Sequence, residues 1–105
     1  MTGAGDLVER VRTALREVID PEIGFNIVDL GLVYDVAVAG DGVARISMTT
    51  TTRGCPATGY LRDGAGEAAQ SVAGVHCADV ELTYDPPWAP DMMSQAAKDY
   101  LGGGR

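Results

Sequence analysis

The sequence is short of cysteine, of histidine and of positive charge, and each shortage excludes a class of protein. Its 105 residues include two cysteines, Cys55 and Cys77, and one histidine. Two cysteines without a Cys-x-x-Cys spacing make neither a disulfide framework nor a zinc finger. Eight Lys and Arg stand against 15 Asp and Glu, giving a net charge of −7. This balance argues against a nucleic-acid surface or an anionic membrane surface, because both need clustered positive charge.

Long apolar runs are also missing, so the sequence predicts neither a membrane-spanning helix nor a secretory signal. The cytoplasm is therefore the expected location. The length suits a single domain over residues 1–105, with flexible tails expected at 1–5 and 102–105.

Apolar residues at helical spacing predict helices over residues 6–19, 57–72 and 93–101. Asp6 and Glu9 resemble a capping box at the start of the first helix. Gly64 and Gly66 weaken the second helix, and we expect close packing or local softness beside them.

Alternating residues predict strands over residues 30–38, 43–50 and 76–84, with a hairpin turn at 40–42. The expected fold is α+β, a two-layer α-β-β-α-β-α domain in which helices cover a small three-stranded mixed sheet. The hairpin makes the first two strands antiparallel, and the strand-helix-strand unit makes the second and third parallel.

This topology brings three loops to one rim of the sheet. They carry polar residues and a tryptophan, namely Asp20, Glu22, Asn26, Asp29, Thr51, Thr52, Cys55, Asp85 and Trp88. His76 and Cys77 fall at the opposite rim. Loops held by a rigid scaffold are where binding chemistry usually occurs, so this rim is the candidate site.

Cys55 is the residue of the rim most suited to chemistry. It lies between a β-branched run and Pro56, which predicts a place at the N-cap of the second helix. Unpaired N–H groups and the helix dipole at that position favour a thiolate, which binds metal or attacks an electrophile. The alternative is a small residue in a tight turn.

The other rim residues also have structural alternatives. Asp20, Glu22 and Asp29 are either metal ligands or turn formers, and Asn26 and Asp29 could bond the backbone of their own loop. Trp88 is either a lid over the core or, with Pro87, part of a partner-contact loop.

Cys55 lacks a nearby base, because His76 is a strand length away, about 26 Å. This distance excludes a Cys–His nucleophilic pair. Iron–sulfur clusters generally take four protein ligands. One thiolate could share a cluster only with a second subunit or a partner, or hold it briefly with carboxylate help. A lone thiolate with carboxylates does not distinguish iron from zinc.

Three stretches of the chain carry a family resemblance: DPEIGFNIVDLGLVYDV, MTTTTRGCP and DPPWAPDMMS. Together they resemble the domain-of-unknown-function-59, or MIP18-like, family of metal–sulfur cluster assembly factors. Its members act in SUF-associated iron–sulfur maturation and in phenylacetate degradation. The resemblance implies a compact α/β domain, often a homodimer, without catalytic residues of its own.

Carried over residue by residue, the resemblance places the family's acidic motif on Asp20 and Glu22, with Asn26 and Asp29 following. It places the reactive cysteine, which makes transient contact with iron, a cluster or a client thiol, on Cys55 after Thr51 and Thr52. Arg53 departs from the proline that is usual there and adds positive charge beside the cysteine. The phenylacetate subunit carries a cysteine-rich extension that this sequence does not show, so we expect the stand-alone assembly factor.

The resemblance therefore implies an accessory factor in iron–sulfur protein maturation, with no stably bound cofactor. Its partners would be the assembly machinery or client apo-proteins. Two alternatives are a non-catalytic adaptor subunit of a multicomponent oxygenase and a small reductase or isomerase. The enzyme alternative has little support, because the sequence shows neither a phosphate-binding glycine pattern nor a complete acid–base set.

Overall fold

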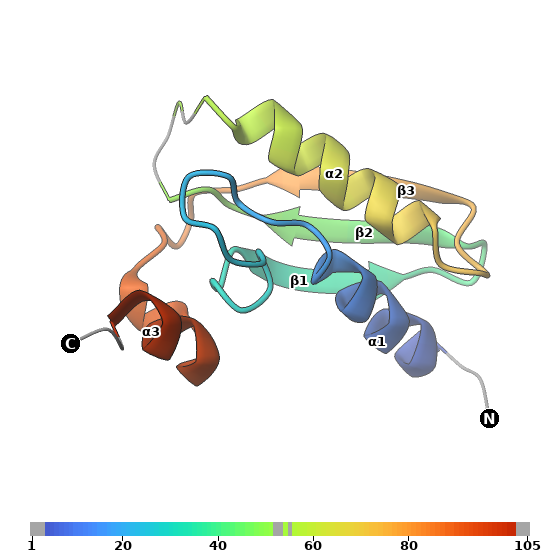
Figure 1. The fold of residues 1–105 in the computed structure, drawn as a ribbon. Coiled ribbons are helices and arrows are strands. Elements are labelled where there is room, and N and C mark those ends of the chain that lie inside the picture. Colours follow the sequence, from blue (N-terminus) through green and yellow to red (C-terminus); the bar gives the residue numbers. More distant parts are fainter. Residues whose placement is uncertain (1–3, 52–53, 55, 103–105) are drawn as a thin grey trace.

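The structure is a computed structural model that describes residues 4–51, 54 and 56–102. Along the chain the elements are α1 (Ala4–Leu15), β1 (Val33–Val38), β2 (Val43–Met48), α2 (Thr58–Gln70), β3 (Cys77–Leu82), a 3₁₀ helix η1 (Pro90–Met92) and α3 (Gln95–Gly102). Figure 1 shows α1 and α2 on one face of the sheet and α3 beside the loops at one end. The predicted order of helices and strands is confirmed.

The sheet has the strand order β1-β2-β3. β1 and β2 are antiparallel, whereas β2 and β3 are parallel and pair from Val43 with Cys77 to Met48 with Leu82. This is the predicted three-stranded mixed sheet, with α2 as the crossover between its parallel strands.

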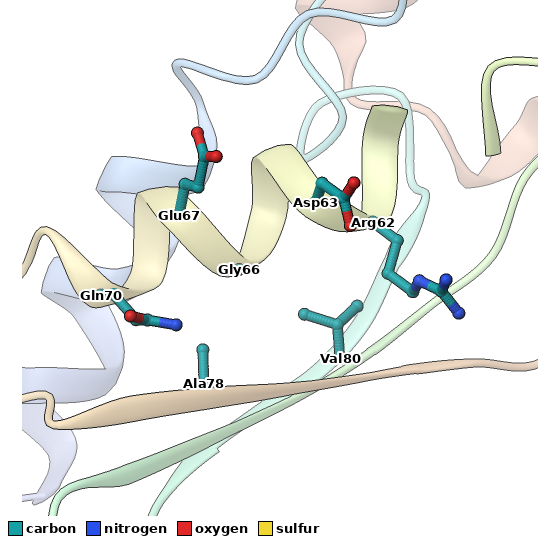
Figure 2. Close-up of a pocket in the computed structure, with 7 residues that line it drawn as sticks. All are labelled: Arg62, Asp63, Gly66, Glu67, Gln70, Ala78 and Val80. Carbon is teal, nitrogen blue, oxygen red and sulfur yellow. The ribbon is translucent and has the colours of Figure 1, made fainter. Parts of the chain in front are cut away.

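The core lies between the sheet and the two helices. Ala44, Ile46 and Met48 point into it from β2, as their alternation predicts. α2 packs over β3, and Figure 2 shows Gly66 on the side of the helix that faces Ala78 and Val80. The other face of the sheet is solvent-exposed.

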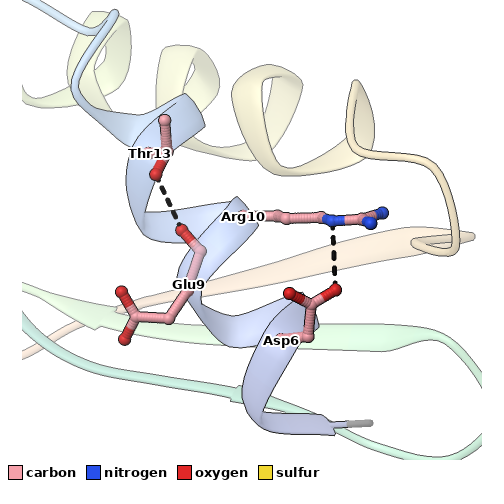
Figure 3. Close-up of polar contacts among 4 residues, drawn as sticks. All are labelled: Asp6, Glu9, Arg10 and Thr13. Carbon is pink, nitrogen blue, oxygen red and sulfur yellow. Dashed lines mark hydrogen bonds and ion pairs between the residues drawn. The ribbon is translucent and has the colours of Figure 1, made fainter. Parts of the chain in front are cut away.

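The first helix differs from its prediction at both ends. α1 begins at Ala4, so Asp6 lies within the helix and pairs with Arg10 at 3.2 Å instead of capping it. Figure 3 shows this ion pair beside the bond from the Thr13 hydroxyl to the carbonyl of Glu9. The helix ends at Leu15 and not near Ile19, because the next residues bond three positions back in tight turns.

The first strand starts three residues later than predicted, at Val33. Gly31 has a φ of +80°, a left-handed conformation that a strand does not contain. A β-bulge then falls between Val33 and Asp35, at Tyr34. Alternation along this strand predicts Leu32, Tyr34, Val36 and Val38 on one face, and this is wrong, since Val33 shares the core face with Val36 and Tyr34 does not.

The C-terminal segment folds against the loop between α1 and β1. η1 precedes α3, which begins two residues later than the predicted helix. Ala97 is fully buried, and the rings of Phe25 and Tyr100 lie 4.8 Å apart. Among the described residues, no helix is long and apolar enough to cross a membrane.

Candidate functional site

Three loops meet at the end of the sheet where β2 terminates. The Thr49 N–H donates to the carbonyl of Leu32 at 2.8 Å, and the Thr83 N–H donates to the carbonyl of Met48 at 2.9 Å. The indole N–H of Trp88 donates to the carbonyl of Leu30 at 2.8 Å. The predicted convergence is confirmed, and we call this end of the sheet the rim.

The opposite end holds His76 and Cys77, also as predicted. The His76 N–H bonds the carbonyl of Gly42 in the β1–β2 hairpin at 2.8 Å. Cys77 is a free, exposed thiol. Neither residue belongs to the rim.

Asp20 shapes the loop that enters the rim. It is 2% exposed, and its Oδ1 accepts the N–H of Glu22 at 2.8 Å and of Ile23 at 3.3 Å. Its carbonyl also accepts the N–H of Gly24 at 2.7 Å. These bonds are those of a turn former, the structural alternative for this carboxylate. Glu22 itself is exposed.

Asn26 and Asp29 bond each other. The Asn26 amide donates to Asp29 Oδ2 at 2.8 Å, and its Oδ1 accepts the Asp29 N–H at the same distance. The Asp29 carbonyl accepts the N–H of Ser94 at 2.7 Å. The pair therefore fixes its own loop, while the Asp29 backbone ties that loop to the segment before α3.

The structure adds a cluster of hydroxyl groups that the sequence reasoning missed. Thr49 and Thr50 follow β2 and are 0% and 1% exposed. Thr50 Oγ1 lies 2.8 Å from the Tyr84 hydroxyl, and the Tyr34 hydroxyl donates to the carbonyl of Pro86 at 2.8 Å. The two tyrosines flank the end of the central strand, a placement that the strand order alone could have indicated.

Tyr34, at the rim, has a raised pKa. Burial raises the pKa of Tyr34 above its ordinary value of 10.0, and a hydrogen bond with the Thr49 side chain acts in the opposite direction. The bulge in β1 directs this side chain toward the 83–90 loop, because it takes Tyr34 out of the regular alternation. The hydroxyl is therefore neutral at physiological pH and holds two loops together.

The predicted cysteine loop is described only in part. Thr51 is half-buried in a bend beside Thr50. Thr52, Arg53 and Cys55 lie outside the described residues.

The predicted capping role of Cys55 is wrong, because the N-cap of α2 is Ala57. Ala57 is 8% exposed and belongs to the core, and its carbonyl accepts the N–H of Leu61 at 2.9 Å. Pro56 lies in the turn before it and not at the first helical position. Helix capping therefore no longer supports the expectation that Cys55 is a thiolate.

Trp88 packs partly buried against the core, which is the arrangement of a lid. Pro87 beside it is exposed, and contact of this loop with a partner stays a prediction. Across the described ranges, no three His, Cys, Asp or Glu residues are grouped so that they could hold a metal ion.

Comparisons with known proteins identify the family and agree with the fold described above. The model of a family described as "Iron-sulfur cluster assembly protein" matches residues 8–82. The Fe-S protein maturation auxiliary factor YitW of Bacillus subtilis is 43% identical over 96 residues, which cover 91% of this chain and 94% of that protein. The iron-sulfur cluster carrier protein of Synechocystis is 33% identical over 79 residues, 75% of this chain but 22% of that longer protein. A solved domain of unknown function 59 from Bacillus anthracis superposes with a TM-score of 0.90 at 37% identity, over 94% of each chain.

Proposed function

The chain belongs to the iron–sulfur cluster assembly protein family, and from this premise we propose that it is an accessory factor in the maturation of iron–sulfur proteins. Its partners are the assembly machinery or client apo-proteins, and its place of action is the cytoplasm. The observation that carries the proposal is the match to a maturation auxiliary factor along almost the whole of both chains.

The rim is the proposed working surface, with Cys55 as the thiol that contacts iron, a cluster or a client cysteine. Asp20, Asn26 and Asp29 support it indirectly, because their hydrogen bonds hold the loop that borders the end of β2. Glu22, Thr51, Thr52 and Arg53 are proposed as polar neighbours. Pro87 and Trp88 form the proposed partner-contact loop.

The cargo is proposed to be held only in transit. A cluster generally needs four protein ligands, and Cys77 lies at the far end of the sheet from the rim. The remaining ligands must then come from the donor, the client or a second copy of the chain in a homodimer. Incomplete ligation suits a carrier, because a cargo that is weakly held can be released.

The proposed role is non-catalytic. The relatives matched over most of this chain are named as an auxiliary factor and a carrier. The Asp20 and Asp29 carboxylates bond within their own loop, and the Tyr34 hydroxyl bonds across to the carbonyl of Pro86, which is the arrangement of a scaffold. Turnover of any substrate by the purified protein alone would contradict this role.

The test uses the two cysteines as a matched pair. Cys55→Ser and Cys77→Ser make the same chemical change, the replacement of one thiol by a hydroxyl. The first makes it at the proposed site and the second at the exposed start of β3. Each variant is expressed in cells that lack the native protein, and the activities of iron–sulfur enzymes are measured under iron limitation. We expect Cys77→Ser to restore these activities and Cys55→Ser to fail, with both variants folded by circular dichroism.

Anaerobic iron and sulfide analysis with absorption spectroscopy then asks whether Cys55 touches the cargo. Iron and chromophore present in wild type and Cys77→Ser but lost in Cys55→Ser would identify the ligand. Full restoration of enzyme activity by Cys55→Ser would refute the proposed role of the thiol. Partner binding that survives in an inactive Cys55→Ser variant would exclude a purely adaptor function.

A further inference from the structure

β3 is an edge strand with an open side. It pairs with β2 alone, and within the described residues no other strand lies beside it. Backbone groups of successive strand residues point to opposite sides, and just after β3 the Thr83 N–H bonds the Met48 carbonyl of β2. By this alternation and the β2–β3 register, the backbone groups of Cys77, Asp79 and Glu81 face β2, and those of Ala78, Val80 and Leu82 point away from the sheet. They form a template for one further strand.

A groove runs along this edge between β3 and α2. It encloses about 330 Å³ and is lined by Arg62, Asp63, Gly66, Glu67, Gln70, Ala78 and Val80. Figure 2 shows Ala78 and Val80 rising from β3 toward Gly66, with Gln70 and Arg62 at the two ends of the groove. The missing side chain of Gly66 and the short one of Ala78 leave room for side chains of an added strand.

The surroundings of the edge are acidic on both sides. Asp79 and Glu81 are exposed on the open face of the sheet, and Asp63 and Glu67 are exposed on α2. Two arginines offset part of this charge. Arg62 lines the groove, and Arg45 is the register neighbour of Asp79 on β2. The carboxylates outnumber the guanidinium groups, as they do in the whole chain.

We propose that the open edge of β3 binds an extended, lysine- or arginine-rich segment of a partner protein by strand addition. Main-chain hydrogen bonds to Ala78, Val80 and Leu82 would supply affinity, and the acidic flanks would select a basic segment. A second copy of this chain fits poorly, because antiparallel pairing of two β3 strands brings Asp79 and Glu81 of both copies together. Like charges opposite each other destabilise a strand pair.

This inference goes beyond the proposed function and does not depend on Cys55. It concerns how a partner is held, and it can be tested on metal-free protein. The probe is a synthetic peptide of alternating Lys and Val, long enough to pair with the six residues of β3. One control peptide has Glu in place of Lys. A second keeps the Lys–Val sequence but carries N-methyl groups on alternate backbone nitrogens, which removes the donors that pair with a strand.

Binding is followed by amide NMR titration and by hydrogen exchange. We expect the Lys–Val peptide to shift the amides of β3 and α2 and to protect those of Ala78, Val80 and Leu82 from exchange. Its affinity should exceed that of the Glu–Val peptide by about tenfold, because several exposed charge pairs each contribute a fraction of a kcal/mol. The N-methylated peptide should lose the protection.

Two variants of the protein locate the interaction. Glu81→Lys reverses an exposed charge at the edge and should weaken binding of the Lys–Val peptide several-fold. Asp35→Lys makes the same change on β1, at the other edge of the same sheet face, and should bind nearly as the wild type does. Both side chains are exposed, so neither variant should disturb the fold.

Three results would overturn the proposal. Equal binding of the N-methylated peptide, or shifts scattered over the surface without protection of β3, would reduce the interaction to nonspecific charge attraction. Equal effects of Glu81→Lys and Asp35→Lys would place the binding elsewhere. Protection of β3 in a dimer without peptide, detected by sedimentation, would make a second copy the occupant of the edge.

Discussion

Gly64 and Gly66 allow a sharp test of how α2 packs, because alanine at these two positions should have different effects. Both lie inside α2 with backbone conformations that alanine can adopt, since neither is among the glycines with positive φ. Replacing glycine by alanine within a helix gains about 1 kcal/mol from propensity alone. The two substitutions therefore start from the same expected gain.

The surroundings of the added methyl group then separate them. At position 66 the new Cβ would lie 3.8 Å from Val80 Cγ2, an ordinary contact, so Gly66→Ala should stabilise the fold by about 1 kcal/mol. At position 64 it would lie 3.3 Å from Cγ1 of Val18, which is 7% exposed and must give way. Overpacking of this kind costs about 1–3 kcal/mol. We expect Gly64→Ala to be neutral or destabilising.

The assay is urea denaturation followed by far-UV circular dichroism, with a thermal melt beside it. For a domain of this size, 1 kcal/mol corresponds to a shift of about 4–8 °C in Tm. Gly59→Ala is the control, because a Cβ there meets nothing within 4 Å and reports helix propensity without packing. Val18→Ala should rescue Gly64→Ala through a favourable coupling energy. Equal stabilisation at 64 and 66, or the absence of coupling with Val18, would refute the packing argument.

Three further predictions concern the loops of the rim. Asp20→Ala should lower the free energy of unfolding by about 1–2 kcal/mol, because the Glu22 N–H loses its acceptor and the Ile23 N–H keeps only its bond to the Asp20 carbonyl. Asp20→Asn keeps a side-chain oxygen and should lose less in the same urea titration. The pKa of Tyr34 is raised in the folded state, so the unfolded state loses this proton first as the pH rises. The contribution of Tyr34 to stability should therefore be complete below pH 10.0 and fall as the pH rises beyond it. Tyr34→Phe should flatten that fall in urea titrations on either side of pH 10.0. Trp88→Phe keeps a ring against the core but removes the bond to the Leu30 carbonyl, and should cost about 1 kcal/mol in thermal melts followed by far-UV circular dichroism; an unchanged Tm would mean that this bond contributes nothing.

The topology could be predicted from the sequence because it follows from alternation and from loop length. The inward set of β2 alternates without interruption, and the hairpin and the α2 crossover leave one reasonable strand order. Element ends were predicted less well. They depend on single backbone conformations, such as the positive φ of Gly31 and the bulge at Tyr34, which the residue pattern does not encode.

The roles of the rim residues were harder to predict for a different reason. Threonines such as Thr49 and Thr50 look like surface residues in a sequence, yet they are buried here because each hydroxyl has a hydrogen-bond partner. Asp20 looks like a ligand, yet its oxygen is used by the turn that it forms. Which polar group is already engaged depends on contacts between distant segments, and that information appears only in three dimensions.

The rim and the β3 edge are adjacent, and this gives the two proposals a common geometry. β3 runs parallel to β2, so its carboxyl end leads into the rim at Thr83. Its six residues span about 20 Å. A basic segment paired along β3 would have one end at the rim and the other near the β1–β2 hairpin. A client or donor could be held by its backbone while its cysteines reach the proposed thiol, so binding and cargo contact would be separate steps. Glu81→Lys should then weaken peptide binding and leave the iron content of the protein unchanged. Cys55→Ser should lower the iron content and leave peptide binding unchanged.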